Sequence, residues 1–267
     1  MYTYIRSQEA VIFGVTIGIF LLFSIFLDKF LTTGNILTLM RTVSILGILS
    51  AGMAIVVIAK GVDLSMISTL AVGTALASVL SSPDVLPFID IPFNYSVLLG
   101  LLFVVLLCSV TGMLVAYWDL APVFVTLAMG SVIYGTGRTL FIGDELNYLP
   151  EDAKWLEFLG RGQFIGIPMP IICFIISLFI IYVILNKTVF GNYIYSIGDN
   201  PTAARTAGVP VRPILVFIFI LSGIIAYFSG LLTAGAISSI NTRMVNSTLI
   251  YDVLLVVVVG GIGLSGG

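Results

Sequence analysis

Asp63 and Asp252 are acidic residues that stand beside long apolar segments of this sequence. A carboxylate in such a position can bind a proton or a cation, so both are candidates for a functional site. Each also has a plainer interpretation. Lys60 and Asp63 are three residues apart, which suits an ion pair on a helix or a tight, solvated turn, and Asp252 suits a helix end near lipid headgroups. The residues alone leave these alternatives open.

The sequence offers few other groups for chemistry. It has no histidine, which is the commonest metal ligand and the commonest proton shuttle at neutral pH. Cys108 and Cys173 lie within apolar runs, where a thiol usually acts as a small hydrophobic group. No phosphate-binding loop of the Gly-x-x-x-x-Gly-Lys type occurs. We therefore expect no bound metal, no cofactor and no enzymatic activity, so that any nucleotide hydrolysis must come from another chain.

Residues 197–209 have the pattern of a short helix between two apolar segments. Asn200 suits the N-cap, Pro201 suits the first helical position with its fixed φ, and Gly208 suits the left-handed residue that ends a helix. So short a helix cannot stand alone in water and must pack on something. It is either a contact for a partner or an interfacial turn that lies on the protein's own helices.

Composition shows which elements must position these groups. The sequence is 59% hydrophobic and only 9% charged, which leaves a water-soluble domain too little polar surface. Its charge-free runs are long enough for helices that cross a hydrocarbon core of ~30 Å. We therefore predict an all-α fold, a polytopic transmembrane helix bundle that forms one domain over residues 1–267. The predicted spans cover about residues 11–27, 40–59, 66–82, 95–117, 121–142, 164–186, 213–236 and 249–263.

Small residues at regular spacing indicate where these helices pack closely. Gly14 and Gly18 share one face of the first span, and Ala226, Gly230 and Ala234 share one face of the seventh. We expect both faces to contact neighbouring helices.

The orientation in the membrane does not follow from basic residues. With the N-terminus inside, five Lys and Arg residues lie on the cytoplasmic side and six lie outside, so the positive-inside rule does not decide. The two long connections are residues 143–163, which are rich in acids, and 187–213. No run of basic residues indicates a nucleic-acid partner.

Five blocks of the sequence, in order, carry a resemblance to a known family. They are Phe30–Ile36, Gly61–Ser65, Pro122–Leu127, Phe190–Gly208 and Gly260–Gly267. With these blocks the chain resembles the permease subunits of bacterial ABC importers for ribose, xylose, galactose and related sugars, including the autoinducer-2 importer. Where that family usually has glycine, this chain has Lys60 and Ile67, and Ile250 replaces the usual glutamate.

The resemblance implies a permease of about ten spans in a bacterial inner membrane, of which this chain would hold eight and lack the last C-terminal ones. It implies a homodimer or heterodimer of permease subunits, a cytoplasmic ATP-binding subunit and an extracytoplasmic sugar-binding protein. The segment around Asn200 then becomes the coupling helix, which places the N-terminus in the cytoplasm. Its coupling residues would be Gly198, Asn200, Pro201, Ala203, Ala204, Arg205 and Gly208. Candidates for the translocation path or its gates are Asp63, Ser65, Thr126, Asn241 and Asp252.

Two contacts with partners follow as expectations. The short helix would dock on the ATP-binding subunit through its small face, Ala203, Ala204 and Ala207. The acidic loop 143–163 would face outward and attract the external binding protein through Glu145, Glu151 and Asp152.

Other functions are compatible with parts of the sequence. A branched-chain amino acid permease of the same broad superfamily shares the glycine-ended blocks. An ion-coupled secondary transporter would use Asp63 or Asp252 to bind a proton or cation, and would show an inverted repeat with interrupted helices. A membrane enzyme would need a cluster of reactive groups, and the sequence shows none.

Overall fold

The computed structural model describes residues 8–82, 91–140 and 145–263, and nearly all of this chain is helical. Each of the predicted apolar spans is a helix, so the expected all-α bundle is confirmed. These helices are α1 (Gln8–Phe26), α2 (Thr33–Ile58), α3 (Met66–Leu80), α4 (Phe93–Tyr117), α5 (Pro122–Leu140), α7 (Met169–Lys187), α10 (Val211–Ile237) and α11 (Leu249–Val259).

Several of these helices differ in length from the predicted spans. Among the described residues, α2, α4, α7 and α10 are long and apolar enough to cross a membrane. In contrast, α3 has 15 residues and α11 has 11. At ~1.5 Å per residue these two are shorter than a hydrocarbon core of ~30 Å.

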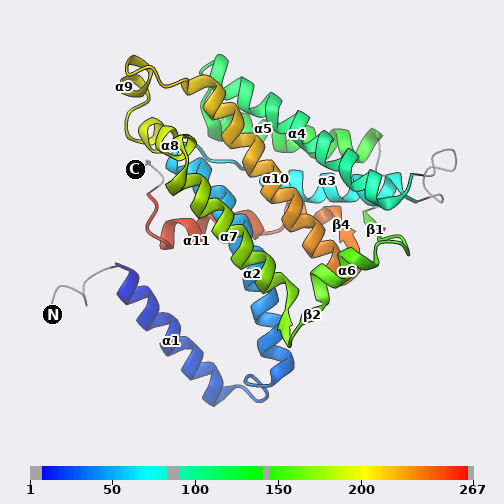
Figure 1. Cartoon of the computed structure of the whole chain (residues 1–267). Coiled ribbons are helices and arrows are strands. Elements are labelled where there is room, and N and C mark those ends of the chain that lie inside the picture. Colours follow the sequence, from blue (N-terminus) through cyan, green and yellow to red (C-terminus); the bar gives the residue numbers. More distant parts are fainter. Residues whose placement is uncertain (1–7, 83–90, 141–144, 264–267) are drawn as a thin grey trace.

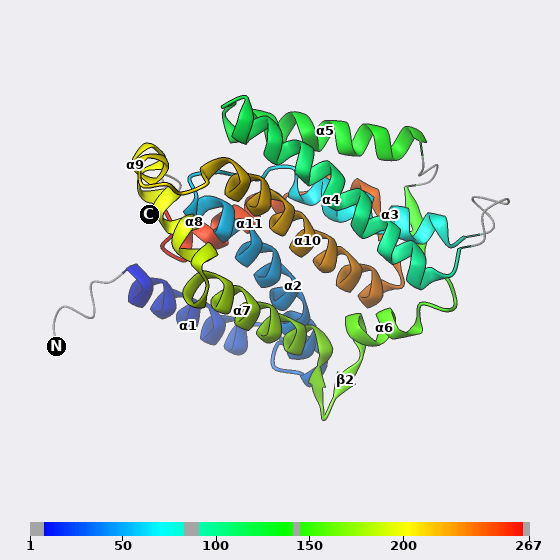
Figure 2. The same ribbon diagram turned by 45° about the horizontal axis from the view of Figure 1, so that its top comes forward.

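Helix α10 runs through the middle of the bundle, with α4 on one side and α2 on the other (Figures 1 and 2). It also packs on α3, whose residues from Met66 to Val79 are all buried. The predicted small-residue face makes this contact possible, since Ala226 and Ala234 are fully buried in one cluster with α3. A Cβ atom on Gly230 would collide with Thr74 and Leu70 of α3. Close approach of α3 and α10 therefore forms the centre of the molecule.

Helix α1 stands apart from this bundle (Figure 1). Its apolar side chains are largely exposed, and the rings of Phe20 and Phe23 pack against the ring of Phe30 in the following turn. Nothing in the described chain lies within 4 Å of a Cβ atom built on Gly14 or Gly18. The predicted close-packing face of this helix therefore has no partner helix among the described residues.

The irregular elements gather at two opposite ends of the bundle. One, called here the α9 end, holds α8 (Val189–Asp199) and α9 (Pro201–Thr206). The other, the α6 end, holds α6 (Lys154–Arg161), the 3-10 helix η2 (Thr242–Asn246) and four short strands. The strands are β1 (Leu146–Tyr148), β2 (Gln163–Phe164), β3 (Ile167–Pro168) and β4 (Ser239–Asn241). Strand β1 pairs antiparallel with β4, and β2 with β3. The α6 end is thus tied together by pairing between distant parts of the chain.

Candidate functional site

The segment between α2 and α3 leaves the helical path at Lys60. The backbone N–H of Lys60 donates to Val57 O and that of Gly61 to Val56 O, each at 2.9 Å, which is the hydrogen-bond pattern of a Schellman helix end. Lys60 has φ 61°, the left-handed conformation that this motif requires. A residue with a Cβ atom adopts it at a cost of about 1 kcal/mol relative to glycine. The chain then turns back into the bundle instead of leaving it.

Asp63, in this segment, is buried and fully hydrogen-bonded. It is 1% exposed, and its Oδ1 accepts from the backbone N–H of Ser65 at 3.1 Å and from Ser65 Oγ at 2.6 Å. Its Oδ2 accepts from Ser222 Oγ of α10 at 2.7 Å. The Lys60 ammonium does not approach Asp63, and it donates instead to Asp199 O at 2.7 Å. The helical ion pair is therefore wrong, and the solvated turn describes Lys60, which is exposed in a turn, but not the buried Asp63.

Thr126 of α5 holds the same segment from another side. Its hydroxyl lies 3.1 Å from Val62 O and 2.9 Å from Pro122 O, and it can donate to either. Three of the predicted site residues, Asp63, Ser65 and Thr126, thus meet around residues 62–65. Ser222 was not among the predicted site residues. It precedes Ala226 by four residues and continues the small-residue face of α10 toward this segment.

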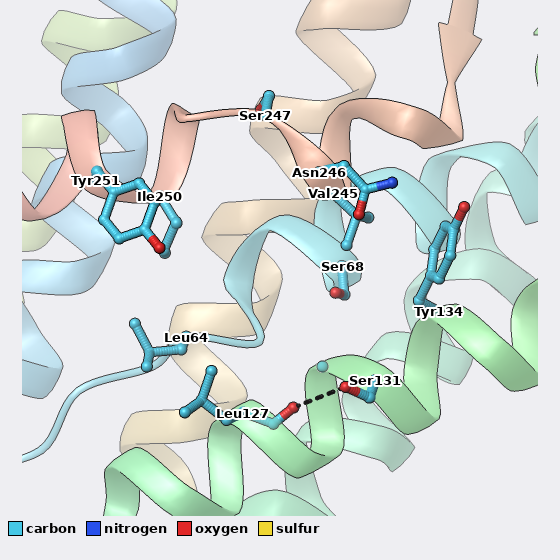
Figure 3. A pocket seen from close by; sticks show the side chains of 11 residues that line it. Leu64, Ser68, Leu127, Ser131, Tyr134, Val245, Asn246, Ser247, Ile250 and Tyr251 are labelled. Carbon is cyan, nitrogen blue, oxygen red and sulfur yellow. Dashed lines mark hydrogen bonds between the residues drawn. The ribbon is translucent and has the colours of Figure 1, made fainter.

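A pocket of 480 Å³ opens next to this segment (Figure 3). Its walls come from the start of α3, from α5, from η2 and from the start of α11. In the view of Figure 3, the Ser68 hydroxyl lies between Asn246 and Ser131. The lining residues are Leu64, Ser68, Leu127, Gly130, Ser131, Tyr134, Val245, Asn246, Ser247, Ile250 and Tyr251. Hydroxyl and amide groups therefore share the wall with apolar side chains, and no described lining residue is charged.

The two remaining path candidates lie outside this pocket. Asn241 is exposed at the α6 end, where its side-chain oxygen accepts from the backbone N–H of Arg243 at 2.9 Å and caps η2. Asp252 is exposed on the first turn of α11, next to the pocket-lining Tyr251. In the described part of the chain its carboxylate has no hydrogen bond or ion pair. The structure therefore does not bring Asn241 and Asp252 together with Asp63.

The segment 197–209 has the predicted local structure. Asn200 Oδ1 accepts from the backbone N–H groups of Thr202 and Ala203 at 3.0 and 3.1 Å, and Pro201 begins α9. Gly208 has φ 86°, a conformation that side chains disfavour. The short helix projects from the bundle beyond α8 (Figure 1).

The expected docking face of α9 needs one correction. Ala203 and Ala207 are exposed, but Ala204 is buried against the chain's own core. Gly198 is also internal, because a Cβ atom there would collide with the carbonyl oxygen of Ile58 at the end of α2. Only the exposed residues around these two positions are free to contact another protein. The sequence pattern identified the helix but not which of its sides faces the bundle.

The acidic loop at the α6 end is more tightly bonded than expected. Glu145 pairs with Arg243 at 2.6 Å and with Arg138 at 3.9 Å. An oxygen of Asp152 accepts from the backbone N–H of Phe93 at 3.2 Å, at the start of α4. Glu151 is exposed, and Asp144 lies outside the described residues. Two of the three acids expected to attract a binding protein therefore hold the loop to the bundle.

Glu157 of α6 joins the acidic loop to the end of α10. It accepts from Ser238 Oγ at 2.6 Å and from Arg161 Nη2 at 2.6 Å. The hydrogen bond from Ser238, followed by that from Arg161, holds the pKa of the Glu157 carboxyl below its usual value. Among the described residues, no group of three or more His, Cys, Asp or Glu side chains is placed to hold a metal ion.

Comparison with known proteins identifies the family. Residues 35–266 match the family described as branched-chain amino acid transport system / permease component. The ribose import permease protein RbsC of Bacillus subtilis is 33% identical over 257 residues, which cover 95% of this chain and 77% of that protein. The L-arabinose ABC transporter permease protein AraH of Azospirillum brasilense is 32% identical, covering 98% of this chain and 74% of that protein.

A further relative, the fructose import permease protein FrcC of Rhizobium meliloti, is 30% identical and covers 96% of this chain and 68% of that protein. No solved structure has significant similarity. The matched residues include the segment between α2 and α3, the pocket lining and α9. This chain therefore belongs to the family of membrane permease components that the match describes.

Proposed function

We propose that this chain is the permease subunit of an ATP-driven importer and that its pocket lies on the path of a simple sugar or related small polar solute. The observation that carries the proposal is the chemistry of the pocket wall. Ser68, Ser131, Tyr134 and Asn246 offer uncharged donors and acceptors beside apolar surface. Sugars present hydroxyl groups and apolar ring faces, so they exchange hydrogen bonds with such a wall without leaving a buried charge unpaired.

An amino acid fits this wall less well. It carries a carboxylate and an ammonium, and removing each from water costs several kcal/mol unless a charged or multiply hydrogen-bonded partner replaces the water. No described residue of the lining provides a charge. The relatives named for ribose, arabinose and fructose support the same choice. The family description leaves branched-chain amino acids as the alternative substrate class.

The ion-coupled alternative has less support. Asp63 has three hydrogen-bond donors and does not line the pocket, so its carboxyl oxygens are occupied within the protein. A site that binds and releases a cation needs ligand oxygens free to reach it. Asp252 keeps this alternative testable, because its exposed carboxylate stands beside the pocket.

The different elements at the two ends of the bundle support an arrangement of partners. We place the α9 end in the cytoplasm, against the ATP-binding subunit, because α9 projects from the bundle and exposes Ala203 and Arg205. The N-terminus is then cytoplasmic as well. The α6 end receives the external binding protein. The helices that flank the pocket, α5 and α11, also expose Phe124 and Leu255, which supports a second permease chain that closes the pocket.

Uptake by proteoliposomes tests the substrate class. The complex of this chain with its ATP-binding subunit is reconstituted, and uptake of labelled ribose and leucine is measured with ATP and the cognate binding protein. We expect uptake of the sugar, and a several-fold loss in Ser68→Ala and Asn246→Ala. Ser109→Ala is the control, because Ser109 bonds only Val105 O of its own helix, away from the pocket. ATP-dependent leucine uptake without sugar uptake would contradict the proposal.

A further inference from the structure

The end of α2 and the end of α8 meet at one joint. The ammonium of Lys60 donates to the backbone carbonyl of Asp199, the last residue of α8, at 2.7 Å. Beside this bond, Gly198 lies so close to the carbonyl of Ile58 that a side chain would not fit. Asn200, which caps α9, follows Asp199 directly. The joint therefore links α2 to the residue immediately before the coupling segment.

The left-handed backbone of Lys60 makes this bond more than a chance surface contact. At φ 61° a glycine would be free of strain, yet the chain places there a long side chain that reaches across to α8. A cation also suits this position, since the last carbonyls of a helix carry partial negative charge. The Lys60 side chain thus makes a bond to α8 that the left-handed backbone, which glycine would also adopt, does not require.

On its other side, the joint leads straight to the pocket. The chain just after Lys60 is held by Thr126 at the carbonyl of Val62 and by Ser222 at the carboxyl group of Asp63. The next residue, Leu64, lines the pocket. Even fully extended, the distance from Lys60 to Leu64 is at most ~14 Å. One short segment, bonded to α5 and α10, therefore connects the Lys60–Asp199 joint to the pocket wall.

We propose that Lys60 is a positioning residue that transmits movement of α8 and α9 to the pocket wall through residues 61–65. This inference rests on the proposed function, because it assigns α9 to the contact with the ATP-binding subunit. Without the Lys60 bond, α9 moves with the ATP-binding subunit while Leu64 stays in place. Hydrolysis of ATP then continues with less transport.

Three variants separate transmission from helix capping. Lys60→Met keeps the length of the stem but removes the donor, Lys60→Arg keeps a donor, and Lys60→Gly removes both the donor and the backbone strain. In the reconstituted complex we expect the sugar transported per ATP hydrolysed to fall at least three-fold in Lys60→Met and in Lys60→Gly, and to stay within two-fold in Lys60→Arg. Lys60→Gly should be at least as heat-stable as the natural chain, so lower stability cannot explain its loss.

A labelling experiment reads the transmission without any sugar. A cysteine at Leu64 is labelled with a methanethiosulfonate reagent in the full complex, with and without ATP. Cys108 and Cys173 are buried and give little background. We expect ATP to change the labelling rate in the natural background and not in Lys60→Met. An equal response to ATP in both backgrounds would overturn the inference, whereas absent sugar uptake with an intact labelling response would overturn only the proposed substrate.

Discussion

Ser222 supplies to Asp63 a hydrogen bond that the segment 61–65 cannot provide itself. Ser65 occupies one carboxyl oxygen, and Ser222 of α10 occupies the other. A buried carboxyl oxygen without a donor is costly, because its bond to water has been lost. One of the donors to Asp63 therefore stands 159 positions away in the chain.

Replacing Ser222 with alanine should lower stability measurably. The change leaves Asp63 Oδ2 without its donor, which we expect to cost about 1–3 kcal/mol. Ser229→Ala is a matched control, because Ser229 is on the same helix and equally buried, but its hydroxyl donates to Ile225 O of its own helix. Thermal unfolding of the purified protein in detergent measures both. Equal effects of the two substitutions would contradict the assignment.

The Glu157 bond should make the docking of α6 sensitive to acid. Because the folded state lowers the pKa of Glu157, its contribution to stability is present above the unfolded pKa of ~4.3 and is lost as the pH falls through the folded value. We expect Glu157→Gln to lower the unfolding temperature at pH 7, and the difference from the natural chain to shrink below about pH 4.

Glu151→Gln is the control for this measurement, since Glu151 is exposed on the same loop. Unfolding curves between pH 3 and 7 compare the two variants. A difference for Glu157→Gln that stays constant over this range, or one shared by Glu151→Gln, would contradict the role of the Ser238 and Arg161 bonds.

At the scale of elements, α9 has two sides with different tasks. Ala204 anchors the helix to the bundle, and Ala203, its neighbour, faces away. Helical geometry separates adjacent residues by about 100° around the axis, so one substitution can disturb the fold and the next a partner. This division replaces the single small face that the sequence suggested.

Enlarging each alanine in turn should separate these tasks. We expect Ala204→Leu to overfill the contact with the bundle and to lower stability by about 1–3 kcal/mol. Ala203→Leu should leave the unfolding temperature unchanged and reduce co-purification of the ATP-binding subunit. If neither variant reduces co-purification of the ATP-binding subunit, the proposed docking of α9 is contradicted.

Helices in this protein could be predicted from sequence because each depends on a local, continuous apolar run. The predicted span 95–117, for example, compares with α4 at Phe93–Tyr117. Pairing of β1 with β4 could not be predicted, because Leu146 and Asn241 are distant in the chain and each strand is only three residues long. For the same reason, Ser65 and Thr126 were predicted near Asp63, but Ser222 was not.

Helix α6 was not predicted, because the helix on which it packs is distant in the sequence. Its buried residues, Leu156 and Gly160, fit against the end of α10, where Gly235 and Ala236 leave no room for a Cβ atom on Gly160. The pocket was missed because four separate segments form it. Composition could therefore indicate a membrane path without indicating which hydroxyl groups line it.

At the scale of the molecule, the fold separates two sets of loops to opposite ends. Lys60, Lys187 and Arg205 lie toward the α9 end, whereas Arg41, Arg138 and Arg243 lie toward the α6 end. The predicted spans assign these basic residues to the same two sides. The family of the chain makes it a multi-pass membrane protein, and the proposed orientation places the α9 end in the cytoplasm.

Cysteines at exposed positions of both ends test that orientation. Thr202→Cys lies on α9 and Glu151→Cys on the acidic loop, and the natural cysteines are buried. In intact cells, we expect an impermeant thiol reagent to label the cysteine at Glu151 at once and that at Thr202 only after the membrane is opened. The reverse pattern would place the coupling segment outside and exclude its contact with an ATP-binding subunit.

The complete enclosure of α3 also has a consequence for biosynthesis. Helix α4, which packs on α3, follows it soon in the chain, but α10, which packs on α3 to a similar extent, begins roughly 130 residues after α3 ends. At about 5–20 residues per second, the ribosome needs on the order of ten seconds to make that stretch. Until then we expect the side of α3 that α10 covers to face lipid or the insertion machinery, which its apolar residues tolerate. Its hydroxyls on Thr69 and Ser78 bond carbonyls of the same chain four residues back, so they need no later partner. The side chains of α3 must therefore suit membrane entry first and packing against α10 later.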